Sequence, residues 1–431
     1  MTDLLAARAD MAISLGFHIV FAEIGIAMPA MMVLAEWVAR RTGEPAYREL
    51  ARRWAKGVAV LFAVGAVSGT VLSFELGLLW PRFMQLAGSI VGIPFSLETL
   101  AFFTEAIFLG VYLYAWDRIP PRAHLGAGLA VALSGAASAV FVVMVNAWMN
   151  APAGVVTDAG RIVRVDVLAG MRSPAALAQV IHMLLASYAA VGLAVAGIHA
   201  FLILRGSRSA LHRRALAVAL LVGAPAAILE PLSGDLNGRM VAATQPIKLA
   251  ALEGQFRTER GAPLRIGGWP DTDAGTTRYA IDIPKGLSLL AYGDPDAPVR
   301  GLLDFPREDW PPVAPVHVGF QIMVALGGAM ALVSLWSGWV ALRKRDFAAR
   351  PWLLRALIVA APFGVIATEA GWTVTEVGRQ PWAVQGLLRT SDAVSPMPGL
   401  AAPLVAFTLI YLGLGAVVTG VIRSMVRETE A

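Results

Sequence analysis

The chain contains no cysteine among its 431 residues. Without a thiol it cannot form disulfides, hold an iron–sulfur cluster through thiolates, attach a c-type haem covalently or bind copper through cysteine sulfur. Charge is also scarce, because charged residues make up 15% of the chain, whereas soluble proteins average about 25%. Any redox centre in this protein has to use histidine, methionine or carboxylate ligands.

Apolar residues are abundant instead, at 57% of the chain. About 20 consecutive apolar residues are enough to cross a bilayer as a helix. The fold class predicted is therefore all-α, a polytopic membrane helical bundle of about nine transmembrane helices whose first helix is retained, because the opening residues lack a basic leader. The predicted spans are 11–38, 54–80, 95–116, 124–149, 177–204, 214–232, 314–342, 353–377 and 399–424.

Basic residues predict how the chain is oriented, since positively charged loops stay in the cytoplasm. Every second loop is strongly basic, and these loops carry Arg40, Arg41, Arg48, Arg52, Arg53, Arg118, Arg122, Arg205, Arg208, Arg213, Arg214, Arg343, Lys344, Arg345, Arg350, Arg423 and Arg427. We therefore expect the N-terminus outside and the C-terminus in the cytoplasm. Because these loops account for the net charge of +5, no nucleic-acid partner is expected.

This pattern divides the chain into three parts. Residues 1–232 contain the first six spans, and residues 314–431 contain the last three. Between them, residues 233–313 are rich in glycine, proline, aspartate and arginine and are predicted to form a long loop on the outer side. Loops of this length are usually functional or disordered.

Ionisable side chains inside spans are costly, so each one is a candidate for a functional site. With the predicted orientation, six candidate ligands or proton carriers from five helices fall in the outer leaflet. They are His18, Glu98, Glu105, His182, Met323 and Glu376.

Two of these candidates are histidines with apolar neighbours. His18 and His182 can offer a neutral ring nitrogen to iron. Met323 alone is more typical of flexible core packing, but together with a buried histidine it could complete the axial pair of a low-spin haem. Of the other histidines, His124 and His212 are interpreted as interfacial residues, and His199 and His317 rank below the first pair.

The carboxylates allow two interpretations each. Glu98 and Glu105 are seven residues apart, which places them on one helix face at a separation of about 10 Å. This arrangement suits a proton relay or a helix face with polar neighbours. Glu376 and Arg379 form either an ion pair or a haem site, in which the carboxylate is a weak proximal ligand and the guanidinium binds a propionate.

Several motifs together resemble subunit I of cytochrome bd-type quinol oxidases over essentially the full length. They are GFHIVFAEIGI, GTVLSFELGLLWPRFM, FSLETLAFFTEAIFLGVYLYAWDR, VNAWMN, KLAALEGQF, FQIMV and GWTVTEVGRQPW. The last motif is highly specific, and it contains Trp372, Glu376 and Arg379.

The resemblance implies roles for these residues. His182 and Met323 would be the axial ligands of a low-spin haem b. His18 and Glu376 would be proximal ligands of two high-spin haems, with Trp372 and Arg379 also at the cofactors. Glu98 and Glu105 would act near the haems, and Lys248 and Glu253 would bind quinol in the outer loop, the family's Q-loop. By themselves, a lysine and a glutamate five residues apart would be interpreted as surface charges.

The sequences LSFELGLLWPRFM and FQIMV resemble most the cyanide-insensitive branch of the family, which has a short Q-loop. Gln321 stands where the long-loop enterobacterial type has an arginine. The expected cofactors are therefore low-spin haem b, high-spin haem b, and either haem d or a third haem b in its place.

The predicted activity is that of a terminal oxidase. Quinol, as ubiquinol or menaquinol, would be oxidised on the outer side, and O2 would be reduced to water with cytoplasmic protons, which generates a proton motive force. The resemblance implies a bacterial cytoplasmic (inner) membrane protein in contact with lipid, a subunit II and a small single-span subunit. Two other classes remain open from the residues alone: an ion-coupled secondary transporter, and a haem-b electron carrier without oxygen chemistry.

Overall fold

The structure, a computed structural model, describes residues 2–158, 161–344 and 346–430. Nine helical segments in these ranges are long and apolar enough to cross a membrane, which confirms the predicted number of spans. They are α1 (Asp3–Thr42), α2 (Pro45–Leu79), α3 (Pro81–Tyr114), α4 (Pro121–Asn150), α6 (Ala176–Leu204), α7 (Ala210–Thr244), α10 (Val313–Leu342), the consecutive pair α11 (Pro351–Ala360) and α12 (Phe363–Val377), and α14 (Ala401–Glu430).

Local sequence sets where these helices begin and end. The hydroxyl of Thr2 accepts a hydrogen bond from the Leu5 backbone N–H and caps α1, as N-cap residues do. Several helices start with proline, which lacks the N–H that a first turn would leave unpaired; these include α2, α3, α4 and α11. Gly43, in the left-handed region at a φ of 73°, ends α1, as expected for a helix C-terminus.

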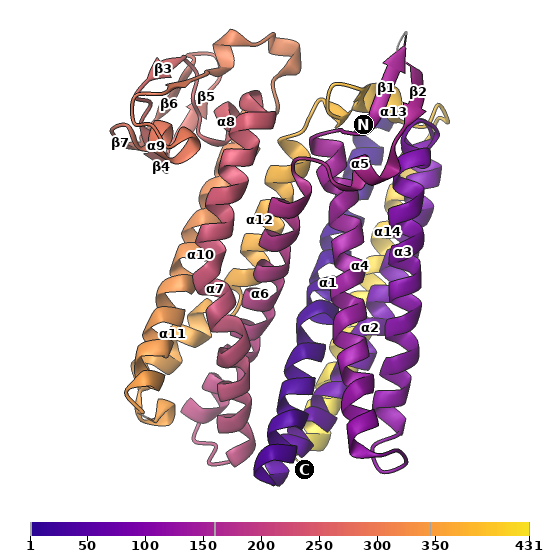
Figure 1. Ribbon diagram of the computed structural model, residues 1–431, viewed down its shortest axis with the longest axis vertical. Coiled ribbons are helices and arrows are strands. Elements are labelled where there is room, and N and C mark those ends of the chain that lie inside the picture. Colours follow the sequence, from indigo (N-terminus) through magenta and orange to yellow (C-terminus); the bar gives the residue numbers. More distant parts are fainter. Residues whose placement is uncertain (1, 159–160, 345, 431) are drawn as a thin grey trace.

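The spans form two groups that stand side by side (Figure 1). One group consists of α1, α2, α3, α4 and α14, and the other consists of α6, α7, α10, α11 and α12. The groups meet where α6 packs against α1 and α4. The N-terminus and the segment between α7 and α10 lie at one end of the molecule, and α14 finishes at the other (Figure 1).

Short antiparallel strand pairs cover the end that holds the N-terminus (Figure 1). The pairs are β1 (Val155–Asp158) with β2 (Arg161–Val165), β3 (Glu259–Arg260) with β8 (Pro298–Val299), β4 (Leu264–Ile266) with β7 (Ile281–Ile283), β5 (Trp269–Asp271) with β6 (Thr276–Arg278), and β9 (Trp382–Val384) with β10 (Leu388–Arg389). The short helices are α5 (Val167–Met171), α8 (Pro246–Leu252), α9 (Gly286–Tyr292) and α13 (Thr390–Ala393), with single 3₁₀ turns η1 (Leu302–Asp304), η2 (Arg307–Asp309) and η3 (Phe347–Ala349).

The predicted division at 232/233 falls inside α7, which continues to Thr244. Residues 233–244 are polar enough to be taken for loop, yet they extend the helix beyond its apolar part. The Q-loop as the structure describes it therefore runs from 245 to 312, and it consists of short helices and hairpins rather than irregular chain.

Two glycines allow α6 and α7 to approach closely. A Cβ built on Gly192 would lie 2.5 Å from the Cα of Gly223, and one built on Gly223 would lie 2.8 Å from the Cα of Gly192. Real side chains do not reach backbone atoms at such distances, so the pair fixes the separation of the two helices. Because His182 also lies on α6, this close approach fixes the position of the histidine relative to α7.

Gly223→Ala is therefore expected to destabilise the protein by about 1–3 kcal/mol, the usual cost of overpacking. Gly238→Ala on the same helix is the matched control, because no neighbouring atom lies within 4 Å of its Cβ position. In the control, alanine should leave stability unchanged or raise it by up to about 1 kcal/mol. Thermal unfolding of both variants in detergent would measure this, and equal shifts for both would contradict the packing argument.

Candidate functional site

A hydrogen bond to serine fixes the ring of His18. Its Nδ1 lies 2.9 Å from the hydroxyl oxygen of Ser68 on α2. That hydroxyl donates to the carbonyl oxygens of Val64 and Gly65, at 3.0 and 3.1 Å. Because its proton is committed, Ser68 accepts the hydrogen bond, Nδ1 carries the ring proton, and Nε2 keeps a lone pair for a metal.

His182 repeats this arrangement on α6. Its Nδ1 lies 2.9 Å from the hydroxyl of Ser233 and 3.0 Å from a carboxylate oxygen of Glu230, both on α7. The Ser233 hydroxyl donates to the Glu230 carbonyl at 2.8 Å, so Nδ1 is again the donor and Nε2 the coordinating nitrogen. Oxygen partners behind a histidine are typical of haem and metal ligands.

The other four histidines use their rings differently. His124 is 1% exposed, and its nitrogens lie 3.0 Å from a Glu36 carboxylate and from the Tyr112 carbonyl. Residues of α1 and α3 thus bury the ring of His124 in the first turn of α4, and its interfacial position stays a prediction. His199 and His212 face each other through Nδ1 at 3.0 Å. His317 engages two backbone carbonyls. His124 and His317 are poorer candidates for iron because both of their ring nitrogens are engaged, whereas His199 and His212 differ from His18 and His182 in that no serine hydroxyl with a committed proton fixes their tautomers among the described contacts.

Met323 lies on α10 against α12. Its sulfur is 3.1 Å from the position that a Cβ of Gly371 would take, so the glycine provides the space that the thioether occupies. Gly371 opens the GWTVTEVGRQPW motif. Since α6 and α10 both pack against α7 and α12, His182 and Met323 belong to the same group of helices.

A continuous polar network surrounds Glu376. Arg379, 3% exposed, donates through Nη2 to Oε2 of Glu376 at 2.5 Å, and Asn146 donates to Oε1. Asn150 donates to Asn146 at 3.0 Å, and Nζ of Lys248 donates to Asn150 at 2.9 Å. Both asparagines come from the VNAWMN motif on α4, whose role sequence reasoning did not identify.

Within this network the ion pair interpretation of Glu376 and Arg379 is correct, and it leaves the carboxylate accessible. The Glu376 side chain is 33% exposed, whereas that of Arg379 is 3% exposed. The Nη1 atom of Arg379 is buried and has no hydrogen-bond partner among the described residues. A buried guanidinium nitrogen without an acceptor is a suitable place for an anionic group such as a propionate. Trp372 lies one helical turn before Glu376, on the same side of α12.

Lys248 and Glu253, the predicted quinol-binding pair, have separate surroundings although both are 4% exposed. Lys248 points into the Glu376 network. Burial lowers the pKa of Lys248 to about 7, with a further contribution from the nearby charge of Arg379. Burial raises the pKa of Glu253 to about 8, and the charge of Arg265 opposes this shift.

Glu98 and Glu105 lie between α3 and α4. Glu98 accepts a hydrogen bond from the hydroxyl of Ser138 at 3.1 Å. Glu105 is 5% exposed, and its Oε2 lies 3.2 Å from the Cβ position of Gly135. Its Oε1 is buried without a hydrogen-bond partner among the described residues. The two carboxyls thus line the seam where α3 packs on α4.

The structure adds buried carboxyls that sequence reasoning missed. Glu23 on α1 and Glu369 on α12 lie near each other, and Asp10 and Glu75 lie near Tyr411. All four have buried oxygens without hydrogen-bond partners among the described residues. The signal was present, because Glu23 and Glu369 are ionisable residues within predicted spans.

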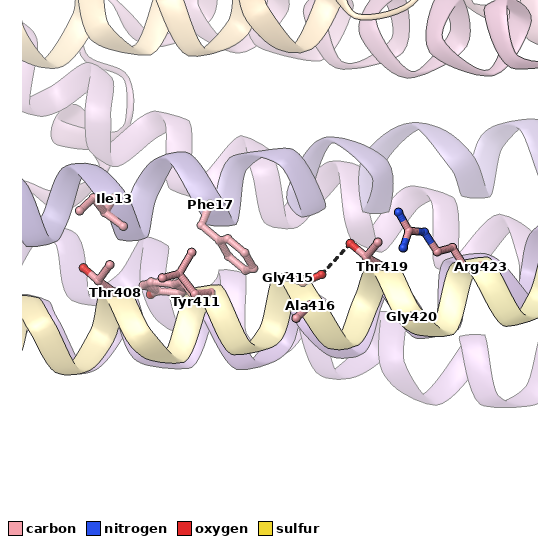
Figure 2. A pocket seen from close by; sticks show the side chains of 10 residues that line it. Ile13, Phe17, Thr408, Tyr411, Gly415, Ala416, Thr419, Gly420 and Arg423 are labelled. Atoms are coloured by element: carbon pink, nitrogen blue, oxygen red, sulfur yellow. Dashed lines mark hydrogen bonds between the residues drawn. The ribbon is translucent and has the colours of Figure 1, made fainter.

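A cavity of about 730 Å³ lies between α1 and α14 (Figure 2), and Tyr411, which lies near Asp10 and Glu75, lines part of it. Figure 2 shows Phe17 and Tyr411 across from each other, with Arg423 toward one end. Small residues such as Gly415 and Ala416 leave the space open. Its lining includes none of the predicted ligands.

Fold and site together define a polytopic membrane protein whose helices carry oriented imidazole, thioether and carboxylate groups. The family model for cytochrome bd terminal oxidase subunit I matches residues 6–430. The chain is 37% identical to the putative cytochrome bd menaquinol oxidase subunit I of Bacillus subtilis, over 99% of this chain and 97% of the relative. It is 31% identical to the cytochrome bd ubiquinol oxidase subunit 1 of the same organism, over 96% and 92%. The structure of bd oxidase from Geobacillus thermodenitrificans superposes with a TM-score of 0.93 at 38% identity, covering 99% of both chains.

The chain therefore belongs to the cytochrome bd terminal oxidase subunit I family. Membership makes it the catalytic subunit of a quinol oxidase in the respiratory chain, with haem cofactors and a subunit II partner, and a multi-pass protein of the bacterial inner membrane. The oxidase prediction is confirmed, and nothing supports the transporter or the electron carrier.

Proposed function

We propose that His182 and Met323 are the axial ligands of a low-spin haem b that receives electrons from quinol. The observation that carries this proposal is the committed serine hydroxyl behind His182, which directs the lone pair of Nε2 away from α7. A histidine and a methionine would together hold such a haem, which would supply electron transfer rather than oxygen binding. The helices that carry the two ligands, α6 and α10, both pack against α12, which supports the assignment.

His18 and Glu376 are the proposed proximal ligands of the two high-spin haems. His18 has the same serine-fixed tautomer, and Glu376 is a partly exposed carboxylate whose orientation Asn146 and Arg379 fix. Arg379, with its unpaired Nη1, would hold a propionate, and Trp372 would pack beside the cofactor. The haems bound here are one high-spin haem b and either haem d or a third haem b. When bound, they supply electron transfer and the iron at which O2 is reduced.

Protons and quinol reach the cofactors through residues of this chain. Glu98 and Glu105 carry protons along the α3–α4 seam, supported by their two-turn spacing and by the Ser138 contact. Glu253 contacts quinol in the Q-loop and accepts its proton. Lys248, which belongs to the Glu376 network, also binds the quinol. The quinol is menaquinol or ubiquinol, the substrates named for the two Bacillus subtilis relatives.

The proposed orientation has the N-terminus and the Q-loop outside and the C-terminus in the cytoplasm, as the basic loops favour. Quinol protons are then released outside, and the protons that form water are taken from the cytoplasm, so turnover separates charge. A small single-span subunit and membrane lipid complete the proposed assembly.

Replacement of either axial ligand is expected to remove the low-spin haem signal. His182→Ala and Met323→Leu should lose the reduced-minus-oxidised absorbance of that haem and keep the high-spin signals. His199→Ala is the control, because this histidine is on the same helix and contacts His212 instead. An unchanged low-spin spectrum in either ligand variant would reject that ligand.

The buried carboxyl of Glu253 predicts a pH dependence for quinol oxidation. Because burial raises its pKa to about 8, the group is neutral below this pH and accepts a proton only above it. The kcat/KM for quinol should therefore rise as pH increases through about 8. Glu253→Gln should lower kcat/KM at least tenfold and should flatten its dependence on pH. A general base usually contributes about 100-fold or more, so tenfold is a cautious lower bound.

Glu308→Gln provides the matched control, since Glu308 is an exposed carboxylate of the same loop. Its profile should follow that of the unaltered protein. If Glu253→Gln kept the wild-type profile and kcat/KM, the Q-loop carboxyl would have no part in quinol oxidation.

A further inference from the structure

Two side chains on the outer turns of α10 hold the Q-loop. Gln321 accepts a hydrogen bond from the backbone N–H of Gly267 at 2.9 Å and donates to the carbonyl oxygen of Arg265 at 3.0 Å. This side chain thus binds the loop backbone as a neighbouring strand would, at the end of β4. A glutamine matches the N–H and the C=O of one extended segment because its amide has both a donor and an acceptor.

His317 makes the second attachment, one helical turn earlier. It is fully buried, and its Nδ1 lies 2.7 Å from the carbonyl of Leu252 while its Nε2 lies 3.1 Å from the carbonyl of Gly267. The ring therefore bridges two parts of the loop, the end of α8 and the turn after β4. Since both nitrogens face carbonyl oxygens, His317 serves the loop and not a haem iron.

These contacts and the proposed haem ligand occupy opposite faces of α10. His317 and Gln321 are four residues apart and share a face, while Met323 follows Gln321 by two residues and is turned by about 200°. Met323 faces Gly371 on α12. One rigid helix thus joins the loop to the low-spin ligand.

The loop backbone held in this way includes the residue next to Glu253 and the arginine whose charge acts on it. Leu252, whose carbonyl meets His317, directly precedes it. Arg265, whose carbonyl meets Gln321, is the cation whose charge acts on Glu253, and its guanidinium donates to the amide oxygen of buried Gln255. The turn that follows contains Gly267 and Gly268, both at positive φ of 66° and 97°, a conformation that glycine adopts without strain.

We propose that His317 and Gln321 are positioning residues for quinol oxidation, which hold the loop backbone on both sides of the site, at Leu252 next to Glu253 and at Arg265, and so fix Glu253 relative to the helix that carries Met323. The inference rests on the proposed quinol role of Glu253. It adds the specific claim that quinol affinity depends on two side chains that do not themselves touch the quinol.

Gln321→Leu tests this claim with a side chain of similar size that cannot hydrogen-bond. In the purified holoenzyme complex, hydrogen exchange of peptides covering 262–268 should accelerate roughly 5- to 30-fold, the equivalent of one or two hydrogen bonds of ordinary strength. The KM for quinol should rise by a similar factor, while kcat at saturating quinol and the low-spin haem spectrum stay unchanged. Gln321→Glu, which keeps the acceptor for the Gly267 N–H, should show a smaller effect on both measurements.

Ser337→Ala is the control, because Ser337 is a buried polar residue of α10 that bonds only within its own helix in the described structure. It should leave exchange and KM unaltered. Faster exchange with an unchanged KM in Gln321→Leu would overturn the proposal, as would unchanged exchange. If KM were insensitive in Gln321→Leu while Glu253→Gln lowered kcat/KM as predicted, the positioning role alone would fail; if Glu253→Gln also kept the wild-type kcat/KM and pH profile, the quinol role of Glu253 would fail as well.

Discussion

The chemistry proposed for this protein depends on a hydrogen bond from a partly buried imidazole to a serine hydroxyl whose own proton is already committed to a helix carbonyl. Ser68 behind His18 and Ser233 behind His182 are held in this way. In each case the serine decides which ring nitrogen carries the proton, and so which one is free for iron. Both serines lie on the helix that follows the ligand helix in the chain, α2 after α1 and α7 after α6, so close packing of neighbouring helices is a condition for the site.

The number of spans could be predicted from the sequence. Apolar runs predicted nine crossings because the bilayer requires a fixed length of apolar chain, and the structure has nine in its described ranges. The end of α7 could not be predicted in this way, because residues 233–244 are helical without being apolar. The order within the Q-loop also depends on contacts with α10, such as those of His317, which no local pattern reveals.

The site was predictable as a set of residues but not as a network. His18, His182 and Glu376 stand out because ionisable groups are rare in spans, whereas Met323 becomes a candidate only in combination with a histidine. Their partners are ordinary residues, such as Asn146 and Asn150, that are distant in sequence from Glu376 and become visible only when α4 packs near α12. Lys248 and Glu253 illustrate the same limit: five residues apart in sequence, they point into different surroundings.

The central claim is that imidazole, thioether and carboxylate groups of both helix groups hold iron porphyrins. The most direct measurement is a pyridine haemochrome assay of the purified complex, combined with reduced-minus-oxidised spectra. The account predicts three haems per chain, one with a low-spin spectrum and two high-spin. A folded preparation that contained no haem, after growth with an adequate supply of porphyrin and iron, would contradict it.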